Sequence, residues 1–182
     1  MSVFSDVNRC TLLHSGGEAQ IYRIEACGKI FALKWYASEN PLNFDVIEKL
    51  CSKRVEGAYR IVEYGKRVGR PYLVYDFIEG VSSDGISPMP VPVALNAMRI
   101  LISRLKRLSD DGFHHGDLNP SNVVFEKNGN PVLIDCGIVG PGALAYAAPE
   151  RLRGGAPNEK SDLFSLGLLL YNGGKSFKGG FL

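Results

Sequence analysis

The chain lacks any hydrophobic run long enough to cross a membrane, and it carries little net charge. Its longest apolar stretch, at residues 166–171, falls far short of the roughly 20 residues that a spanning helix needs. A formal charge of +2 over 182 residues is too small to indicate binding to nucleic acid or to an anionic membrane. The first residues lack the basic start and the apolar stretch of a signal peptide. We therefore expect a protein that is cytoplasmic, or delivered to the cytosol of another cell, and that binds neither nucleic acid nor membrane.

Cysteine is also scarce. The four cysteines, Cys10, Cys27, Cys51 and Cys136, show no C-x-x-C spacing, which argues against a zinc site and against a disulfide framework. Free thiols in a reducing compartment are expected. What the chain has instead is apolar content, 45% of its residues, which suffices for the core of one domain or of two small lobes.

A carboxylate and an amide stand five residues apart in the run H-G-D-L-N-P-S-N at residues 115–122. They are Asp117 and Asn122, and thirteen residues later comes Asp135 in the run L-I-D-C-G. Taken alone, the first run would also fit a turn between helices in which Asp and Asn act as caps. Together the three residues resemble the catalytic centre of protein kinases, where phosphoryl transfer needs an acceptor for the substrate's hydroxyl proton and oxygen ligands for Mg²⁺.

Three further motifs follow the order of the protein kinase-like superfamily. The run F-A-L-K, ending at Lys34, resembles the strand that carries the phosphate-binding lysine. The run Y-A-A-P-E at residues 146–150 resembles the end of an activation segment, and residues 161–167 resemble the start of the central helix of the C-lobe. The resemblance implies an α+β, two-lobed fold: an N-lobe at residues 1–79 with a small antiparallel sheet, and a shortened, mainly helical C-lobe at residues 80–182.

The same resemblance assigns roles to particular residues. Lys34 would orient the phosphates of ATP, Asp117 would accept the proton of the acceptor hydroxyl, and Asn122 and Asp135 would bind Mg²⁺. Glu48, in a segment with helical spacing at residues 43–50, would pair with Lys34; a solvated surface glutamate is the alternative. The remaining expected contacts with ATP are made by Gly16, Gly17, Ala19, Ile21, Ala32, Asp76, Ile78 and Val124.

Residues 92–108 show an apolar stripe of helical period, which predicts the helix that leads into the catalytic loop. The stripe consists of Leu95, Met98, Leu101, Ile102, Leu105 and Leu108. Residues 123–125 and 131–134 predict a short hairpin that presents Asp135. The stretch at residues 80–90, rich in Gly, Ser and Pro, indicates a linker.

Several positions depart from the protein-kinase pattern. Gly116 stands where regulated kinases have an arginine that grips a phosphate, and residues 135–150 contain no Ser or Thr, so switching by such a phosphate is not expected. Asn119 replaces the lysine two residues after the catalytic aspartate, as in small-molecule and sugar kinases, and its loss removes a cation that stabilises transferred charge. Cys136 replaces a phenylalanine after Asp135. His14 and Ala19 stand where the phosphate loop usually has glycines.

The function implied by the resemblance is transfer of the γ-phosphoryl group of Mg-ATP to a Ser or Thr hydroxyl of a protein. One alternative is a kinase of small molecules or sugars, and another is a pseudokinase that acts as a nucleotide-binding interaction module. The short C-lobe predicts apolar surface around Leu166, Leu169 and Leu170, which the chain's own tail, a protein partner or a second copy would cover.

Overall fold

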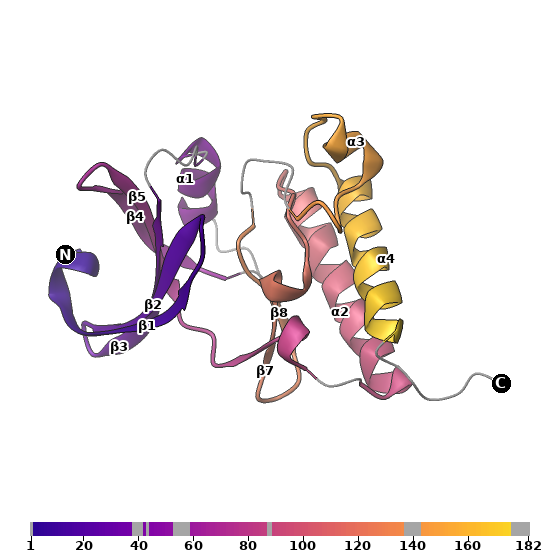
Figure 1. Ribbon diagram of the computed structural model, residues 1–182, viewed down its shortest axis with the longest axis horizontal. Helices are drawn as coiled ribbons and strands as arrows, with labels where there is room; N and C mark the ends of the chain where they lie inside the picture. Colours follow the sequence, from indigo (N-terminus) through magenta and orange to yellow (C-terminus); the bar gives the residue numbers. More distant parts are fainter. Residues whose placement is uncertain are drawn as a thin grey trace. The chain divides into compact units, whose positions relative to one another are not determined.

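The computed structural model describes residues 2–37, 42, 44–52, 59–86, 89–136 and 143–175 (Figure 1). It divides into two compact units, which we call the N-terminal unit (Met1–Arg54 and Tyr59–Ile78) and the C-terminal unit (Val55–Ala58 and Glu79–Leu182). The main division thus falls after Ile78, and the division expected from the sequence fell after Glu79. None of the helices in the described ranges is long and apolar enough to cross a membrane.

The N-terminal unit is a five-stranded antiparallel sheet with one α-helix. Its strands are β1 (Val7–Ser15), β2 (Ala19–Ala26), β3 (Lys29–Tyr36), β4 (Ile61–Arg67) and β5 (Arg70–Asp76), in the order β1-β2-β3-β5-β4. A short 3₁₀ helix, η1 (Phe4–Asp6), precedes them. Between β2 and β3 the chain turns at Cys27 and Gly28, with φ values of 50° and 70°. Two successive positive φ values are those of the tight hairpin turns whose twist matches that of the strands.

One face of this sheet carries its hydrophobic core. Ile24, Phe31, Leu33 and Val74 are buried there together with Val3 from the N-terminal segment. The helix α1 (Phe44–Ser52) buries Ile47 and Leu50, as the spacing in residues 43–50 predicts, and contacts β4. Because β3 is the middle strand of the sheet, its side chains are buried on both faces.

The carboxylate of Glu63 on β4 fastens the N-terminal segment to the sheet. It accepts hydrogen bonds from the Ser2 hydroxyl (2.7 Å), the Phe4 N–H (3.2 Å) and the Tyr72 hydroxyl (2.8 Å). The Phe4 ring packs edge-on against Trp35, with centroids 5.6 Å apart. Burial raises the pKa of Tyr72 to about 12, with the neighbouring Glu63 charge acting in the same direction.

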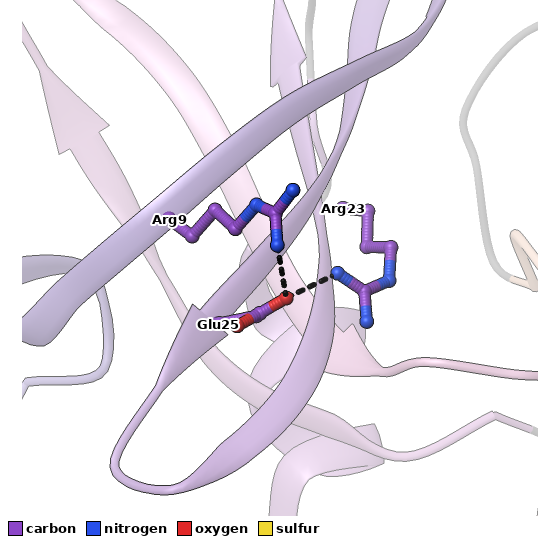
Figure 2. A network of polar contacts seen from close by, with 3 residues as sticks. All are labelled: Arg9, Arg23 and Glu25. Carbon is purple, nitrogen blue, oxygen red and sulfur yellow. Dashed lines mark hydrogen bonds and ion pairs between the residues drawn. The ribbon is translucent and has the colours of Figure 1, made fainter.

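A smaller polar network lies at the surface of β1 and β2 (Figure 2). Glu25 Oε1 accepts a hydrogen bond from Arg23 at 2.6 Å and lies 4.0 Å from Arg9 Nη1 on the neighbouring strand. The hydrogen bond from Arg23 lowers the pKa of Glu25. Because these side chains are solvated, the network stabilises the fold little.

The C-terminal unit combines a three-stranded antiparallel sheet with helices. The sheet has the order β6-β7-β8, from β6 (Gly80–Ser82), β7 (Val123–Glu126) and β8 (Pro131–Leu133). The helices are η2 (Ser83–Gly85), α2 (Val91–Asp110), η3 (Pro120–Asn122), α3 (Pro149–Leu152) and α4 (Glu159–Lys175). The predicted hairpin of β7 and β8 is confirmed, whereas residues 80–85, expected to be a linker, form β6 and η2.

The helix α2 forms where the apolar stripe predicts it, but its buried face is narrower. Leu101, Leu105 and Leu108 are buried together with Ala97, while Leu95 and Ile102 are about half exposed (54% and 47%). The difference arises because α2 contacts α4 and β8, and these neighbours cover only part of the stripe.

The apolar surface expected on α4 is also smaller than the sequence suggested. Leu166 and Leu169 are buried, and Leu170 is 41% exposed. The first two positions were therefore wrongly expected at the surface, because α2 already covers that side of α4. The apolar side chains that α4 does expose are Leu163, Phe164, Leu170 and Tyr171. Residues 176–182, the expected tail, lie outside the described residues.

Candidate functional site

The C-terminal unit places Asp117 in a loop between α2 and η3. The loop begins where α2 ends: Gly112, with φ of 80°, allows the Phe113 N–H to donate back to the Leu108 carbonyl at 2.8 Å, the usual closure of a helix by a left-handed glycine. The loop ends in η3, where Asn119 is the N-cap and its side chain accepts from the Ser121 N–H. Both ends of the loop are therefore held by local hydrogen bonds.

The Asp117 carboxylate accepts hydrogen bonds from three donors. Asn119 Nδ2 reaches Oδ1 at 3.1 Å, and Asn122 Nδ2 reaches Oδ2 at 3.2 Å. The backbone N–H of Ala143, from the predicted activation segment, donates to Oδ1 at 2.7 Å. The two amides also donate to the main-chain oxygen of Asp117, at 3.2 Å from Asn119 and 2.8 Å from Asn122. These contacts fix the orientation of a half-buried carboxylate.

Asn122 and Asp135 lie near each other at the same end of the β7–β8 hairpin. Val123 pairs with Leu133, and the Ile134 N–H donates to the Asn122 carbonyl at 3.0 Å. Because Asn122 Nδ2 is turned toward Asp117, its Oδ1 is left as a candidate metal ligand. Asp135 is 5% exposed and has a left-handed backbone, with φ of 59°. Such a conformation is uncommon for residues other than glycine and is concentrated at functional sites.

The first turn of α4 holds the catalytic loop by its backbone. Asp162 is buried, and its Oδ2 and Oδ1 accept from the N–H groups of His115 (2.7 Å) and Gly116 (2.9 Å). The start of α4 is in turn capped by Asn158 and Ser161, whose side chains each accept the other's backbone N–H at 3.0 Å. The loop position is thereby tied to a rigid helix end.

His115 lies fully buried beneath this loop. Its Nδ1 accepts from the Asp117 N–H at 3.3 Å. Burial lowers the pKa of His115 below its ordinary value of 6.5, against the opposing charges of Asp162, Asp117 and Asp135. The imidazole is therefore neutral at neutral pH and serves as an acceptor for the loop backbone. Burial likewise raises the pKa of Cys136 well above its ordinary value, so this thiol stays protonated.

A small pocket, open to solvent, lies beside Asp117 within the C-terminal unit. Its walls include the activation-segment residues Ala143, Tyr146 and Ala147. The pocket also contains Arg151, which is buried and donates to the Gly155 carbonyl at 2.5 Å.

The N-terminal unit places Lys34 on β3, the central strand of its sheet. Lys34 is 6% exposed, and its Nζ lies 5.0 Å from the centroid of the Tyr36 ring. Lysine is rarely buried to this extent, which makes Lys34 a candidate functional residue. Ile21 pairs with Lys34 across the sheet, and Ala32 is buried two positions before it.

The other expected ATP contacts of this unit lie at strand ends. Gly16 and Gly17 form the exposed turn between β1 and β2, where the Gly16 N–H donates to the carbonyl of buried Ala19 at 3.0 Å. Asp76 ends β5, and Ile78 follows two residues later. Val124 lies on β7 of the C-terminal unit.

Glu48 lies exposed on α1, and the ion pair expected with Lys34 stays a prediction. Burial raises the pKa of Cys51, and the Glu48 charge adds to this effect. Among the described residues, no three His, Cys, Asp or Glu side chains gather as a possible metal cluster.

Three contacts of the site were not foreseen from the sequence. The side chain of Asn119, expected from the sequence only to lack the charge of a lysine, donates directly to Asp117. The N–H of Ala143 and the carboxylate of Asp162 act through backbone hydrogen bonds, which leave no signal in the side-chain pattern. Only the S-D run at residues 161–162, already part of the resemblance, pointed toward Asp162.

Comparison of the sequence with known families and proteins finds kinases. The family of the ABC1 atypical kinase-like domain matches residues 64–144. The DNA damage-responsive serine/threonine-protein kinase RqkA of Deinococcus radiodurans is 30% identical over 188 residues, which cover 88% of this chain and 28% of RqkA. The serine/threonine-protein kinase PknL of Mycobacterium tuberculosis is 26% identical, with 86% of this chain and 46% of PknL covered. The chain thus spans less than half the length of these two relatives.

Comparison of the structure finds kinase domains as well. The PknI kinase domain of Mycobacterium tuberculosis superimposes with a TM-score of 0.75 at 19% identity, covering 94% of this chain and 74% of that domain. The structure of Rad53 1–466 in complex with AMP-PNP gives a TM-score of 0.77 at 24% identity, covering 93% of this chain and 48% of Rad53. These likenesses confirm the predicted α+β fold.

Proposed function

We propose that this chain, which belongs to the protein kinase-like superfamily, binds Mg-ATP and transfers its γ-phosphoryl group to a Ser or Thr hydroxyl of a protein. The observation that carries the proposal is the Asp117 carboxylate, which two side-chain amides and one backbone N–H hold in a single orientation. A carboxylate held in this way is suited to accept a hydroxyl proton. The relatives named as serine/threonine-protein kinases support the same class of acceptor.

The metal would be bound by Asn122 and Asp135. Magnesium prefers oxygen ligands, and the Asn122 amide is turned so that its oxygen remains for a metal. Asp135 follows Ile134, whose N–H donates to the Asn122 carbonyl at the same end of the hairpin. Bound Mg-ATP supplies the phosphoryl group and the charge neutralisation for its transfer. Lys34, buried on β3, would orient the phosphates, with Glu48 as its expected partner.

The adenine and the phosphates would contact backbone at the remaining predicted positions. Asp76 and Ile78, just after the end of β5, offer main-chain groups to adenine. Gly16 and Gly17 form a turn whose backbone a phosphate could approach, because neither residue has a side chain to obstruct it. Ala19, Ile21, Ala32 and Val124 would line the base. These assignments rest on the resemblance.

A small-molecule kinase is the second candidate. It is favoured by Asn119, which stands where protein kinases have lysine, and by the match of residues 64–144 to an atypical kinase-like family. The third candidate, a pseudokinase, would bind nucleotide without transfer. A protein partner at the exposed apolar side chains of α4 is compatible with all three.

Transfer of radiolabelled γ-phosphate separates the candidates. We expect label to appear on a mixture of generic protein substrates, and Asp117→Asn to reduce the rate by roughly 10²–10⁴-fold, because the proton acceptor is lost. Asp110→Asn, an exposed aspartate at the end of α2, is the matched control and should leave the rate unchanged. Label on sugars or amino alcohols alone would favour the small-molecule kinase. Nucleotide binding with no transfer to either class of acceptor would favour the pseudokinase.

A further inference from the structure

The side chain of Asn119 uses its entire hydrogen-bonding capacity. An amide has two N–H donors and two acceptor lone pairs. Nδ2 donates to Oδ1 and to the main-chain oxygen of Asp117, at 3.1 and 3.2 Å. Oδ1 accepts from the N–H and the hydroxyl of Ser121, at 3.0 and 2.6 Å. The side chain is also 7% exposed, so little solvent competes with these contacts. If the Asn119 amide were flipped, its NH₂ group would face the Ser121 N–H, donor against donor. The Ser121 contact therefore determines which way the amide points.

These contacts make the two oxygens of Asp117 unequal. Oδ1 accepts from Asn119 and from the Ala143 N–H, which fills both of its lone-pair positions. Oδ2 accepts from Asn122 alone among the hydrogen bonds of the described residues. One lone pair on Oδ2 thus remains for an incoming donor.

We propose that Asn119 is a positioning residue that holds Asp117 Oδ1, so that Oδ2 is the atom that takes the proton of the acceptor hydroxyl. This inference rests on the proposed phosphotransfer. In that step the acceptor O–H bond breaks and its proton passes to Oδ2. The freed electron pair of the oxygen forms the bond to the γ-phosphorus while the bond to the leaving ADP oxygen breaks.

Asn119 therefore joins two tasks in one side chain. As a donor it binds Oδ1 of Asp117. As an acceptor it caps η3, which ends in Asn122, the second residue that binds the Asp117 carboxylate. A lysine has no acceptor and cannot make this cap.

Two substitutions separate these tasks. Asn119→Ser keeps a good N-cap, since serine and asparagine cap about equally well, but serine is too short to donate to Asp117. Asn119→Lys keeps a donor for Asp117 and loses the cap. Asn130→Ser, in the exposed turn between β7 and β8, is the matched control. The measurements are kcat, KM for ATP and melting temperature at a fixed Mg²⁺ concentration.

The expected pattern is a crossed one. Asn119→Ser should lose about 100-fold in kcat, the scale of a misplaced catalytic group, with KM for ATP and the melting temperature close to those of the unsubstituted protein. Asn119→Lys should retain kcat within about tenfold and melt about 2–4 °C lower, as loss of one cap predicts for a chain of this size. Asn130→Ser should change none of the three values. If Asn119 acted only through the cap, Asn119→Lys, which loses the cap, would have both the lower melting temperature and the lower kcat of the two variants.

Two outcomes overturn the inference: an Asn119→Ser variant with kcat within threefold of the unsubstituted protein, or an Asn119→Lys variant slower than Asn119→Ser.

If the unsubstituted protein transfers no phosphate, the proposed function fails, and NMR decides separately whether Asn119 contacts Asp117. The side-chain amide signals of Asn119, assigned by their loss in Asn119→Ser, should then shift in Asp117→Ala and stay in place in Asp110→Asn. Unshifted signals in Asp117→Ala would refute the contact itself.

Discussion

At the residue scale, the backbone conformation of Asp135 and the charge of its side chain can be tested separately. Its φ of 59° suits aspartate and asparagine about equally, because both visit the left-handed region more readily than other residues. Asp135→Asn therefore removes the charge and leaves the local backbone in place. This substitution is a cleaner probe of metal binding than truncation to alanine.

We expect Asp135→Asn to lose the thermal stabilisation that Mg-ATP gives to the unsubstituted protein. A ligand stabilises the folded state in proportion to the logarithm of its concentration over its Kd, so loss of metal-bridged binding removes the shift. Thermal unfolding with ATP, with and without Mg²⁺, measures it. Asp110→Asn is the control, and a full Mg-ATP shift in Asp135→Asn would show that the carboxylate is not a metal ligand.

Tyr72 offers a second residue-scale prediction. Its folded pKa of about 12 lies above the ordinary value of 10, so the neutral form is favoured in the fold. The resulting stability is present below pH 10 and is lost as the pH rises toward 12. Tyr72→Phe should cost about 1 kcal/mol at pH 8, since it removes the hydrogen bond to Glu63. Urea unfolding at pH 8 and at pH 11 should show a smaller difference at pH 11; an unchanged or larger difference would contradict the assignment.

At the scale of elements, the link between α4 and the catalytic loop depends on both oxygens of Asp162. An asparagine in its place can accept only one of the two N–H groups and presents a donor to the other. Because the site is buried and the hydrogen bonds are charge-assisted, we expect Asp162→Asn to lower the free energy of unfolding by about 1.5–3 kcal/mol. Denaturant unfolding measures the loss. A cost no greater than that of Asp110→Asn would mean that the loop does not depend on α4.

His115 gives the same loop a dependence on pH. Its folded pKa is lowered below 6.5, so the stability contributed by the neutral ring is present above about pH 6.5 and is lost as the pH falls. The melting temperature should therefore decline between pH 7 and pH 5, and the decline should be shallower in His115→Asn. His14→Asn, in exposed β1, controls for histidine content. Equal slopes in the two variants would exclude His115 as the cause.

The sequence predicts an element well where residues close in the chain determine its structure, and poorly where contacts with distant segments determine it. The hairpin of β7 and β8 and the start of α1 follow from turn residues and apolar spacing within a few positions. The strand β6 was missed because its Gly- and Ser-rich sequence resembles a linker. The strand β6 forms by pairing with β7, which is distant in the sequence. Its close approach to β7 requires glycine at position 80, because an added Cβ there would lie 2.3 Å from the Phe125 carbonyl oxygen. The exposure of Leu95 and Ile102 could not be predicted for a similar reason, because the sequence of α2 does not show which elements pack against it.

The same distinction applies to the site. Side chains whose chemistry is recognisable in a motif, such as Asp117 and Asn122, were identified from the sequence, and their contact is present in the structure. The Ala143 N–H escaped notice because any residue except proline could supply it. The motif shows that a cation is missing at Asn119, but it does not show that the Asn119 amide donates to Asp117.

At the scale of the whole molecule, we expect no switch that depends on phosphorylation of Ser or Thr in the activation segment. Gly116 has no side chain with which to bind a phosphate, and residues 135–150 contain no Ser or Thr. We expect treatment with a phosphatase to leave the rate of phosphotransfer within about twofold of the untreated protein, since no charge that orders the loop would be removed. Intact mass before and after treatment verifies the removal. A large loss of rate, traced to phosphate on Tyr146, would contradict this.

The hydrogen bonds from His115 and Gly116 to Asp162 also make these two amide protons a reporter of local opening. A buried N–H bonded to a carboxylate exchanges with deuterium only when that bond breaks. The two protons cannot exchange while the first turn of α4 stays docked, whatever the side chains around Asp117 are doing. Their exchange rates therefore measure how often the catalytic loop parts from its supporting helix, on a timescale of minutes to hours that crystallographic displacement does not reach.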